Sequence, residues 1–207
     1  MQKAQDLIVE PIGLDVETLP RPIVFNQLFG NDHPVELEIG SGKGTFLVDQ
    51  AKTRPDINFI GIEYARWFWR YSSDRLRRNN CQNVRTVRAE AGFFLREFIS
   101  DQSLAAIHIY FPDPWPKKRH HKRRLIQPPF MVQVLRLLQP GGRLQIVTDH
   151  QQYFEQIRQV VTNSPLTPME YLPPGSAADG EFVGTNFERK YRREGRPFYS
   201  VAATKPL

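Results

Sequence analysis

Residues 111–124 bring one carboxylate, one large aromatic ring and a dense run of positive charge into a single short segment. Asp113 and Trp115 alternate there with three prolines, and Lys117 to Arg124 follow with six Lys or Arg and two His. Because proline fixes φ and removes a backbone donor, the turn that holds the acid and the ring is stiff. Clustered cations bind polyanions, and aromatic rings stack on bases. We interpret the segment as a nucleic-acid site; the alternative is a solvated basic loop after a structural turn.

An apolar run, Leu104–Tyr110, directly precedes this segment and predicts a buried strand. Strand and helix patterns alternate on both sides of it. Further strands are expected over 35–40, 58–63, 84–90 and 143–149, and helices through 46–51, 64–78, 93–99, 128–138 and 151–161. This alternation predicts an α/β fold with a mostly parallel, twisted sheet and helices on both faces. Residues 165–172 and 197–205 predict an antiparallel edge hairpin.

Acidic residues stand at or near the ends of all five of these strands. They are Glu38 with Gly40 two residues later, Glu63, Glu90, Asp113 and Asp149. Ligands of open parallel sheets bind at the carboxyl ends of the strands, which meet along one edge. In a chain that is basic overall, these acids predict a cleft for cationic or hydroxyl-rich groups.

The glycine-rich turn at residues 40–44 fits neither common phosphate-binding pattern. A P-loop requires glycine where Leu37 stands and Ser or Thr where Gly44 stands, and the third glycine of the dinucleotide fingerprint falls one residue early. Glu38 would repel a pyrophosphate, but it suits the sulfonium and α-ammonium groups of S-adenosylmethionine. Glu63 is placed to accept from ribose hydroxyls, as the acid does in dinucleotide folds, with Glu90 near the adenine.

Length and composition favour one basic, globular unit. The 207 residues carry 28 Lys and Arg against 22 Asp and Glu, a net charge of +6, which favours an acidic partner. A proline-rich arm is expected over residues 1–34 and a single domain over residues 35–207. No signal peptide or membrane span is apparent, so a cytoplasmic protein is expected. His120 and His121 lack a third ligand, so no metal site is expected.

Several motifs together resemble one enzyme family. They are E-I-G-x-G around Glu38, G-I-E ending at Glu63, P-D-P-W-x-K-x-R-H-x-K-R-R from Pro112, T-D at Asp149 and T-x-F-E from Thr185. Over roughly residues 35–200 the chain resembles the tRNA (guanine-N7-)-methyltransferases. The resemblance implies a Rossmann-like class I methyltransferase fold, S-adenosylmethionine as donor, and guanine 46 in the tRNA variable loop as acceptor.

The resemblance also assigns roles by position. It implies cofactor contacts at Glu38, Gly40, Glu63, Glu90 and Asp113; catalysis at Asp113; substrate contacts at Lys117, Asp149, Thr185, Asn186, Phe187 and Glu188; and RNA contacts at Arg119, His120, His121, Lys122, Arg123 and Arg124. We place Asp113 at the methyl-transfer centre and Asp149 or Glu188 at the base edge. Residues 173–196 are interpreted as a flap that orders on tRNA.

Structural alternatives stand beside several of these roles. Asp149 is alternatively a helix cap, Glu188 a surface ion pair, and Trp115 a core side chain instead of a stacking platform. Trp67 and Trp69 are expected in the core. Two other functions remain open: an amino-group methyltransferase acting on nucleic acid or protein, and a non-catalytic RNA-binding module. No obligate protein partner is expected, so the protein is expected to act as a monomer or homodimer.

Overall fold

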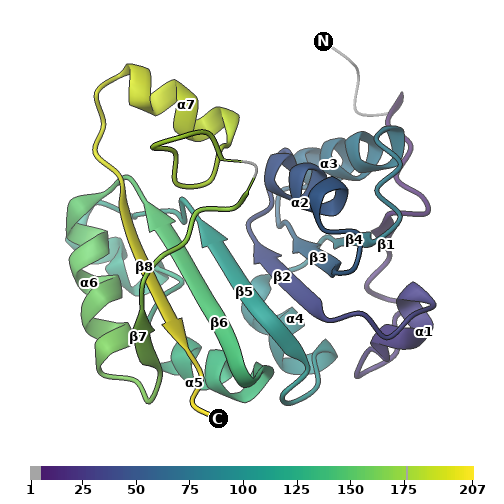
Figure 1. Cartoon of the computed structure of the whole chain (residues 1–207), viewed down its shortest axis with the longest axis horizontal. Helices are drawn as coiled ribbons and strands as arrows, with labels where there is room; N and C mark the ends of the chain where they lie inside the picture. The colour runs from purple at the N-terminus through teal and green to yellow at the C-terminus, as the bar shows by residue number, and fades with distance from the viewer. Residues whose placement is uncertain (1–5, 176) are drawn as a thin grey trace.

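The computed structural model describes residues 6–175 and 177–207. Its centre is one sheet of eight strands in the order β1-β4-β3-β2-β5-β6-β8-β7 (Figure 1). The strands are β1 Gly13–Leu14, β2 Val35–Ile39, β3 Asn58–Ile62, β4 Val84–Val87, β5 Leu104–Tyr110, β6 Leu138–Thr148, β7 Thr167–Met169 and β8 Tyr199–Thr204. The pairs from β1 through β6 are parallel, while β8 runs antiparallel to both β6 and β7. The predicted sheet and its antiparallel edge are confirmed.

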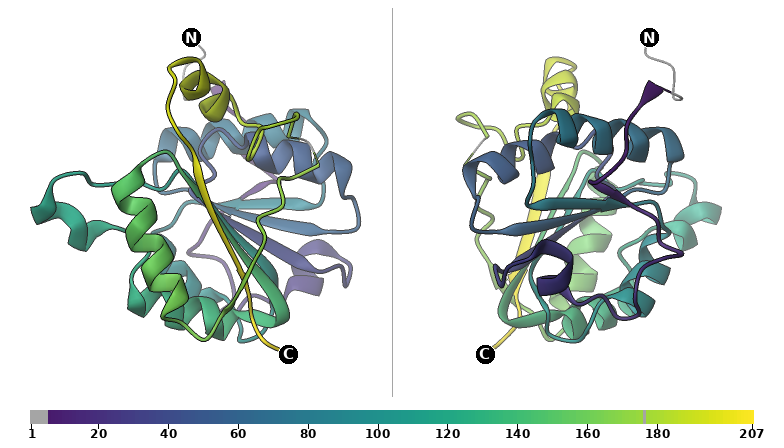
Figure 2. Two further views of the ribbon diagram at one scale, coloured as in Figure 1. Left: turned by 60° about the vertical axis from the view of Figure 1, so that its left-hand side comes forward. Right: turned by 90° about the vertical axis from the view of Figure 1, so that its right-hand side faces the viewer.

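Helices connect the parallel strands and cover both faces of the sheet (Figure 2). They are α1 Phe25–Phe29, α2 Thr45–Thr53, α3 Arg66–Arg78, α4 Ala91–Phe98, α5 Pro128–Leu137, α6 Gln151–Thr162 and α7 Asn186–Arg193, with a short 3-10 helix, η2 Lys118–Arg123. Among the described residues, no helix is both long and apolar enough to cross a membrane.

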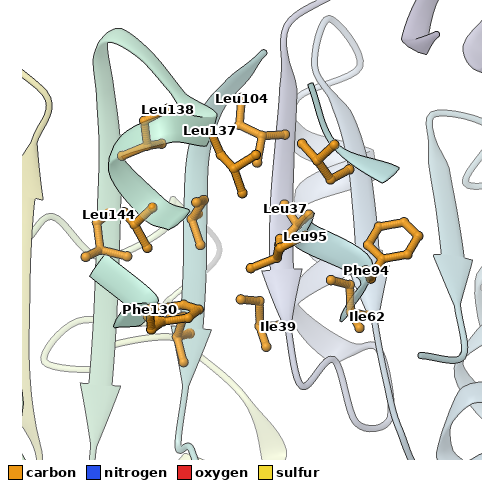
Figure 3. Packing of buried hydrophobic residues seen from close by; sticks show 14 of the residues in the cluster. Leu37, Ile39, Ile62, Phe94, Leu95, Leu104, Phe130, Leu137, Leu138 and Leu144 are labelled. Carbon is orange, nitrogen blue, oxygen red and sulfur yellow. The ribbon is translucent and has the colours of Figure 1, made fainter. Parts of the chain in front are cut away.

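Side chains that alternate along the strands supply two cores, because successive residues of a strand point to opposite faces. Leu37 and Ile39 of β2 belong to the larger core, together with side chains of α4, α5 and α6 (Figure 3). The opposite face packs on Phe46 and Leu47 of α2 and on Leu76 of α3. Glu36 and Glu38 alternate with the apolar residues of β2, so both carboxylates are buried on the α2 side.

The amino-terminal segment packs along one edge of the sheet and around the α4 side. Gly13–Leu14 adds a parallel strand beside β4, and Thr86 N donates to Ile12 O at 2.9 Å. Further along the chain, Ile23 N donates to Phe98 O at 2.8 Å at the end of α4. Residues 1–5 lie outside the described part of the chain.

Three details differ from the sequence expectations. The strand expected over 143–149 begins earlier, at Leu138, so Pro140, Gly141 and Gly142 lie inside β6. Trp67, expected in the core, is 39 % exposed on α3 and stacks on Tyr71. The helix α7 was not predicted: its Asn-Phe-Glu-Arg-Lys-Tyr-Arg-Arg sequence is short and strongly polar.

Glu36 is the centre of a buried polar cluster in the middle of the sheet. It is 1 % exposed and accepts hydrogen bonds from Arg54 (2.5 and 2.8 Å) and from the ring of His108 (2.9 Å). The other ring nitrogen of His108 lies 2.9 Å from the Tyr110 hydroxyl. Burial alone would raise the pKa of Glu36, but the bonds from His108 and Arg54 outweigh it and hold the pKa at about 2.

We predict that Glu36→Gln destabilises the fold by about 2–4 kcal/mol at neutral pH, because the substitution removes one partner of a buried ion pair. The folded-state pKa lies below the unfolded value of 4.5. The contribution of the Glu36 carboxylate to the free energy of unfolding is therefore present above pH 4.5 and is lost as the pH falls toward 2. Denaturant titrations of both proteins from pH 7 to pH 3 measure this difference. A difference in free energy of unfolding between the two proteins that stays constant from pH 7 to pH 3 would contradict the lowered pKa of Glu36.

Candidate functional site

The turn between β2 and α2 is built by glycines in a conformation that other residues rarely adopt. Gly40, Gly42 and Gly44 all have positive φ. Gly40 N donates to Ile62 O at 2.8 Å, which ties the turn to the end of β3. A Cβ on Gly44 would lie 2.9 Å from the Cβ of Ser72, so this glycine also allows α3 to approach. The turn therefore leaves its backbone open toward the carboxyl ends of the strands.

A cavity of about 380 Å³ lies between this turn and α7. It is lined by Glu38, Gly40, Ser41, Gly42, Lys43, Thr45, Phe46, Phe68, Tyr110, Phe111, Thr185, Phe187, Lys190 and Tyr191. The lining comes from β2, the glycine turn, the start of α2, the end of β5, the start of α3 and the segment of α7 with its cap. Figure 1 shows α7 above the ends toward which the arrowheads of β5 and β6 point. We call this cavity the donor pocket.

Glu38 places a buried carboxylate at the base of the donor pocket. It is 5 % exposed, and its Oε2 has no hydrogen-bond partner among the described residues. Burial raises the pKa of Glu38 to about 8, and the nearby charge of Glu63 adds to the shift. A buried, unpaired acceptor costs free energy. The site is therefore suited to a cationic ligand that would supply the missing charge.

Glu63 closes the other side of the glycine turn. Its Oε2 accepts from Gly42 N at 2.9 Å, and its Oε1 accepts from Ala65 N at 2.8 Å. Each carboxylate oxygen keeps a second lone pair. Glu63 therefore fixes the backbone of the turn and still has acceptor capacity for a hydroxyl group.

Glu90 has a structural role in addition to the one expected from the sequence. It is the N-cap of α4, and its carboxylate accepts from Gly92 N at 2.9 Å and Phe93 N at 2.7 Å. Such caps stabilise helices by about 0.5–2 kcal/mol. Glu90 does not line the donor pocket.

Asp113 lies in the turn that leaves β5, with its side chain exposed. Two residues of this turn, Phe111 and Trp115, have left-handed φ values of 53° and 44°. Phe111 lines the donor pocket and packs on Phe187 of α7 at a ring distance of 4.7 Å. Asp113 is therefore held two residues from a pocket-lining side chain, although it does not line the pocket itself.

Trp115 belongs to neither core cluster, which contradicts its alternative role as a core side chain. The guanidinium of Arg123 lies 4.9 Å from its ring centre, and His120 meets it edge-on at 5.8 Å. The ring is therefore part of the surface formed by the basic run.

The basic run itself is mostly exposed, with one exception. Lys117, Lys118, Arg119, Lys122 and Arg123 are exposed, and His120 and His121 are partly so. In Figure 2 (left) the teal segment after β5 projects from the body of the molecule. Arg124 is only 3 % exposed. Its guanidinium faces α6, and this burial does not fit the expectation that Arg124 contacts RNA.

Asp149 and the residues of α7 complete the region. Asp149 forms an ion pair with Arg196 at 3.1 Å. The helix-cap alternative for Asp149 is wrong, because His150 caps α6 by accepting from Tyr153 N at 3.3 Å. Thr185 caps α7 by accepting from Glu188 N at 3.1 Å. The side chain of Asn186 lies outside the described structure.

Glu188 is fully buried and is not a surface ion pair. Its carboxylate accepts from Phe182 N (2.6 Å), Val183 N (2.8 Å) and Gly184 N (3.0 Å), and also from Arg192 at 2.9 Å. Because four donors within the protein already satisfy this carboxylate, it is not placed to read a base edge. We correct that expectation: Glu188 holds the loop that precedes α7.

Several pocket residues were not expected from the sequence. Phe68, Lys190 and Tyr191 line the donor pocket although none of them belongs to the motifs. The alternation of aromatic and basic residues over 182–193 was the available signal. Within residues 6–175 and 177–207, no group of three or more His, Cys, Asp or Glu is arranged to hold a metal ion.

We predict that Glu38→Gln stabilises the ligand-free protein at alkaline pH. The folded-state pKa of about 8 lies above the unfolded value of 4.5. The contribution of Glu38 to the stability of the folded wild type is therefore fully present below pH 4.5 and is lost as the pH rises through 8. The variant has no such loss. Its free energy of unfolding, relative to that of the wild type, should therefore rise by about 2–4 kcal/mol between pH 5 and pH 9. Denaturant titrations across this range test the prediction, and equal pH profiles would refute it.

Comparisons with known proteins agree with this geometry. A family model described as "Putative methyltransferase" matches residues 32–201. The chain is 36 % identical over 200 residues to the tRNA (guanine-N(7)-)-methyltransferase of Alkalilimnicola ehrlichii, covering 97 % of this chain and 84 % of that one. It is 40 % identical over 202 residues to the enzyme of the same name from Bordetella pertussis, covering 97 % and 79 %. The Myxococcus xanthus protein of that name is 35 % identical over 205 residues, covering 97 % of both chains.

Solved structures support the fold. The aminoglycoside resistance methyltransferase NpmB1 aligns with a TM-score of 0.61 at 18 % identity, covering 87 % of this chain and 91 % of that one. An antibiotic-related methyltransferase aligns with a TM-score of 0.63 at 18 % identity, covering 87 % and 92 %. The fold is that of the class I methyltransferases, and the chain belongs to the tRNA (guanine-N(7)-)-methyltransferase family.

Proposed function

We propose that the protein transfers a methyl group from S-adenosylmethionine to N7 of guanine 46 in the variable loop of tRNA. The observation that carries the proposal is the buried, unpartnered Oε2 of Glu38 at the base of the donor pocket. The names of the relatives support the reaction and the tRNA substrate. We further propose that the protein acts in the cytoplasm, as a monomer or homodimer without an obligate partner protein.

The donor pocket fits the proposed cofactor. S-adenosylmethionine supplies an electrophilic methyl group on a sulfonium centre. Glu38 offers its free oxygen to the cationic end of that molecule, and Glu63 keeps acceptor capacity for ribose hydroxyls. Glu90 is already used as a helix cap, so an adenine contact from it would share the carboxylate with Gly92 N and Phe93 N.

Guanine N7 carries a free lone pair and no proton, so no side chain has to act as a base before attack. The contribution of the protein is alignment, which can supply up to about 7–11 kcal/mol of the barrier. We assign Asp113 to the transfer centre, where a fixed carboxylate favours the positive charge that develops on the methylated purine. Phe111 and Phe187 contribute aromatic rings to the lining of the pocket.

Recognition of the acceptor is proposed at the edge between α7 and the basic run. Carboxylates accept from guanine N1–H and N2–H₂, and Asp149 is the acid that remains for this role. Its ion pair with Arg196 would have to open or be shared. Lys117 with Arg119, His120, His121, Lys122 and Arg123 would bind phosphates, and Thr185 and Phe187 would contact the substrate from α7. Asn186 keeps its expected substrate role as a proposal.

The function is tested by incubating the protein with unfractionated tRNA and labelled S-adenosylmethionine, and then cleaving the RNA with aniline. N7-methylguanosine makes the chain sensitive to aniline, so cleavage in the variable loop is the expected outcome. Label without aniline cleavage would indicate an amino-group methyltransferase. Binding of tRNA without any label would indicate a non-catalytic RNA-binding module.

We predict that Asp113→Asn lowers the single-turnover rate at saturating tRNA by at least about 10²-fold, because the substitution removes the negative charge at the transfer centre. Donor affinity and the free energy of unfolding should change little, since the side chain is exposed. Rapid-quench measurements give the rate, and calorimetry gives the donor affinity. A rate within about threefold of wild type would remove Asp113 from the catalytic role.

We predict that neutralising Lys122 and Arg123 together flattens the salt dependence of tRNA binding. Each phosphate contact contributes roughly 0.7–0.9 to the slope of log affinity against log salt, so the slope should fall by about 1.5. Phosphate contacts position the RNA without reading its sequence, so the methylated guanine should stay the same. An unchanged slope with methylation of other guanines would show that the run reads bases.

A further inference from the structure

Arg124 ends the basic run in the sequence, but its side chain lies inside the molecule at 3 % exposure. Its Nε donates to the Pro114 carbonyl at 2.8 Å. Its Nη1 and Nη2 donate to the side-chain oxygens of Gln156 and Gln152 at 2.6 and 3.3 Å. The ring of Tyr153 lies 4.9 Å from the guanidinium carbon. One side chain therefore connects the turn that carries Asp113 to α6.

These contacts do not fit a residue that binds phosphate. All three hydrogen-bond partners of Arg124 are neutral oxygens, and burial lowers its pKa. Burying a cation costs free energy. Arg119 and Arg123 in the same run remain exposed. The guanidinium of Arg124 is therefore committed to contacts within the protein.

The turn that Arg124 holds is in an unfavourable backbone conformation. Phe111 and Trp115, on either side of Asp113, both have left-handed φ, which persists in non-glycine residues only where surrounding contacts enforce it. At the first end, Phe111 N donates to Val147 O at 2.7 Å. At the second end, the bond from Arg124 falls on the Pro114 carbonyl, in the peptide unit that joins Pro114 to Trp115.

We propose that Arg124 is a positioning residue for methyl transfer. It fixes the Pro114 carbonyl against α6 and thereby holds the turn that carries the Asp113 carboxylate, without contacting RNA. Lysine would not replace it, because its three donors share one nitrogen, whereas the planar guanidinium places donors on three separate nitrogens, each of which reaches a different oxygen. The proposal rests on the proposed function, in which Asp113 lies at the transfer centre.

The first test compares Arg124→Lys with Lys122→Ala, which changes an exposed cation of the same run. Both variants and the wild-type protein are assayed with tRNA as substrate. Arg124→Lys should lower the single-turnover rate at saturating tRNA by about 30-fold or more, because misplacing a reacting group by about 1 Å can cost 10²-fold. Its tRNA affinity and salt slope should stay within about twofold of wild type. Lys122→Ala should instead weaken tRNA binding and flatten the salt slope.

The second test observes the turn directly, without tRNA or donor. The three tryptophans of the chain are replaced by 5-fluorotryptophan, and the ¹⁹F resonance of Trp115 is assigned with Trp115→Phe. Arg124→Lys should shift or broaden the Trp115 resonance and leave those of Trp67 and Trp69 unchanged. If Arg124→Lys does not fold, Gln156→Ala, which removes the shorter of the two hydrogen bonds from the guanidinium to α6, should move the same resonance and lower the same rate.

Two results would overturn the proposal. One is a rate within about threefold of wild type together with an unmoved Trp115 resonance. The other is weakened tRNA binding with a reduced salt slope at an unchanged rate, which would make Arg124 an RNA contact. If wild-type protein methylates no guanine in tRNA, the proposed function fails. In that case the fluorine spectrum still decides whether Arg124 holds the turn.

Discussion

The donor pocket depends on one unpaired acceptor, the Oε2 of Glu38, buried at the carboxyl end of β2. Burial alone makes the charged form of this carboxylate unfavourable, and the charge of Glu63 adds to that effect. The glycine turn opens beside it because Gly40, Gly42 and Gly44 accept positive φ, and Glu63 fixes that turn through Gly42 N. A cationic ligand would satisfy the acceptor that the fold leaves unpaired. The ligand-free protein therefore carries a local destabilisation that binding removes.

Buried carboxylates in this protein have contrasting roles that follow from their partners. Glu36 and Glu38 lie two residues apart on the same face of β2, yet the pKa of Glu36 is held at about 2 and that of Glu38 is raised to about 8. The difference arises because Arg54 and His108 donate to Glu36, whereas no described group donates to Oε2 of Glu38. Glu188 resembles Glu36, since Arg192 and three backbone N–H groups satisfy it. Burial together with an absent partner, and not burial alone, distinguishes the proposed ligand site.

The sequence was sufficient for strands β2 to β6, because these are short apolar runs bounded by turn residues and the five helices after them have apolar faces. It did not predict β1, whose two residues lie in the expected proline-rich arm. The sequence also predicted that Glu38 and Glu63 lie close to the glycine turn, since their spacing from it is local; Glu38 lines the donor pocket, and Glu63 accepts from Gly42 N of the turn. It was not sufficient for α7, whose polar sequence becomes a helix through the Thr185 cap and the Glu188 contacts across residues 182–184. Nor did it separate Arg124 from its exposed neighbours, because a run of like charges carries no periodicity that would reveal which member faces α6. These errors arise where the specific contacts of a polar side chain, and not its place in a hydrophobic pattern, decide its role.

The central claim is that the Glu38 carboxylate becomes the counter-charge of a cationic donor, and proton release on binding tests it most directly. With a pKa of about 8 in the free protein, Glu38 is mostly protonated at pH 7. Titration calorimetry of S-adenosylmethionine binding in several buffers of different ionisation enthalpy gives the number of protons released. The account predicts release of close to one proton at pH 7 in the wild type, and both loss of that release and much weaker binding in Glu38→Gln. Binding of equal affinity to both proteins, with no dependence on the buffer, would contradict it.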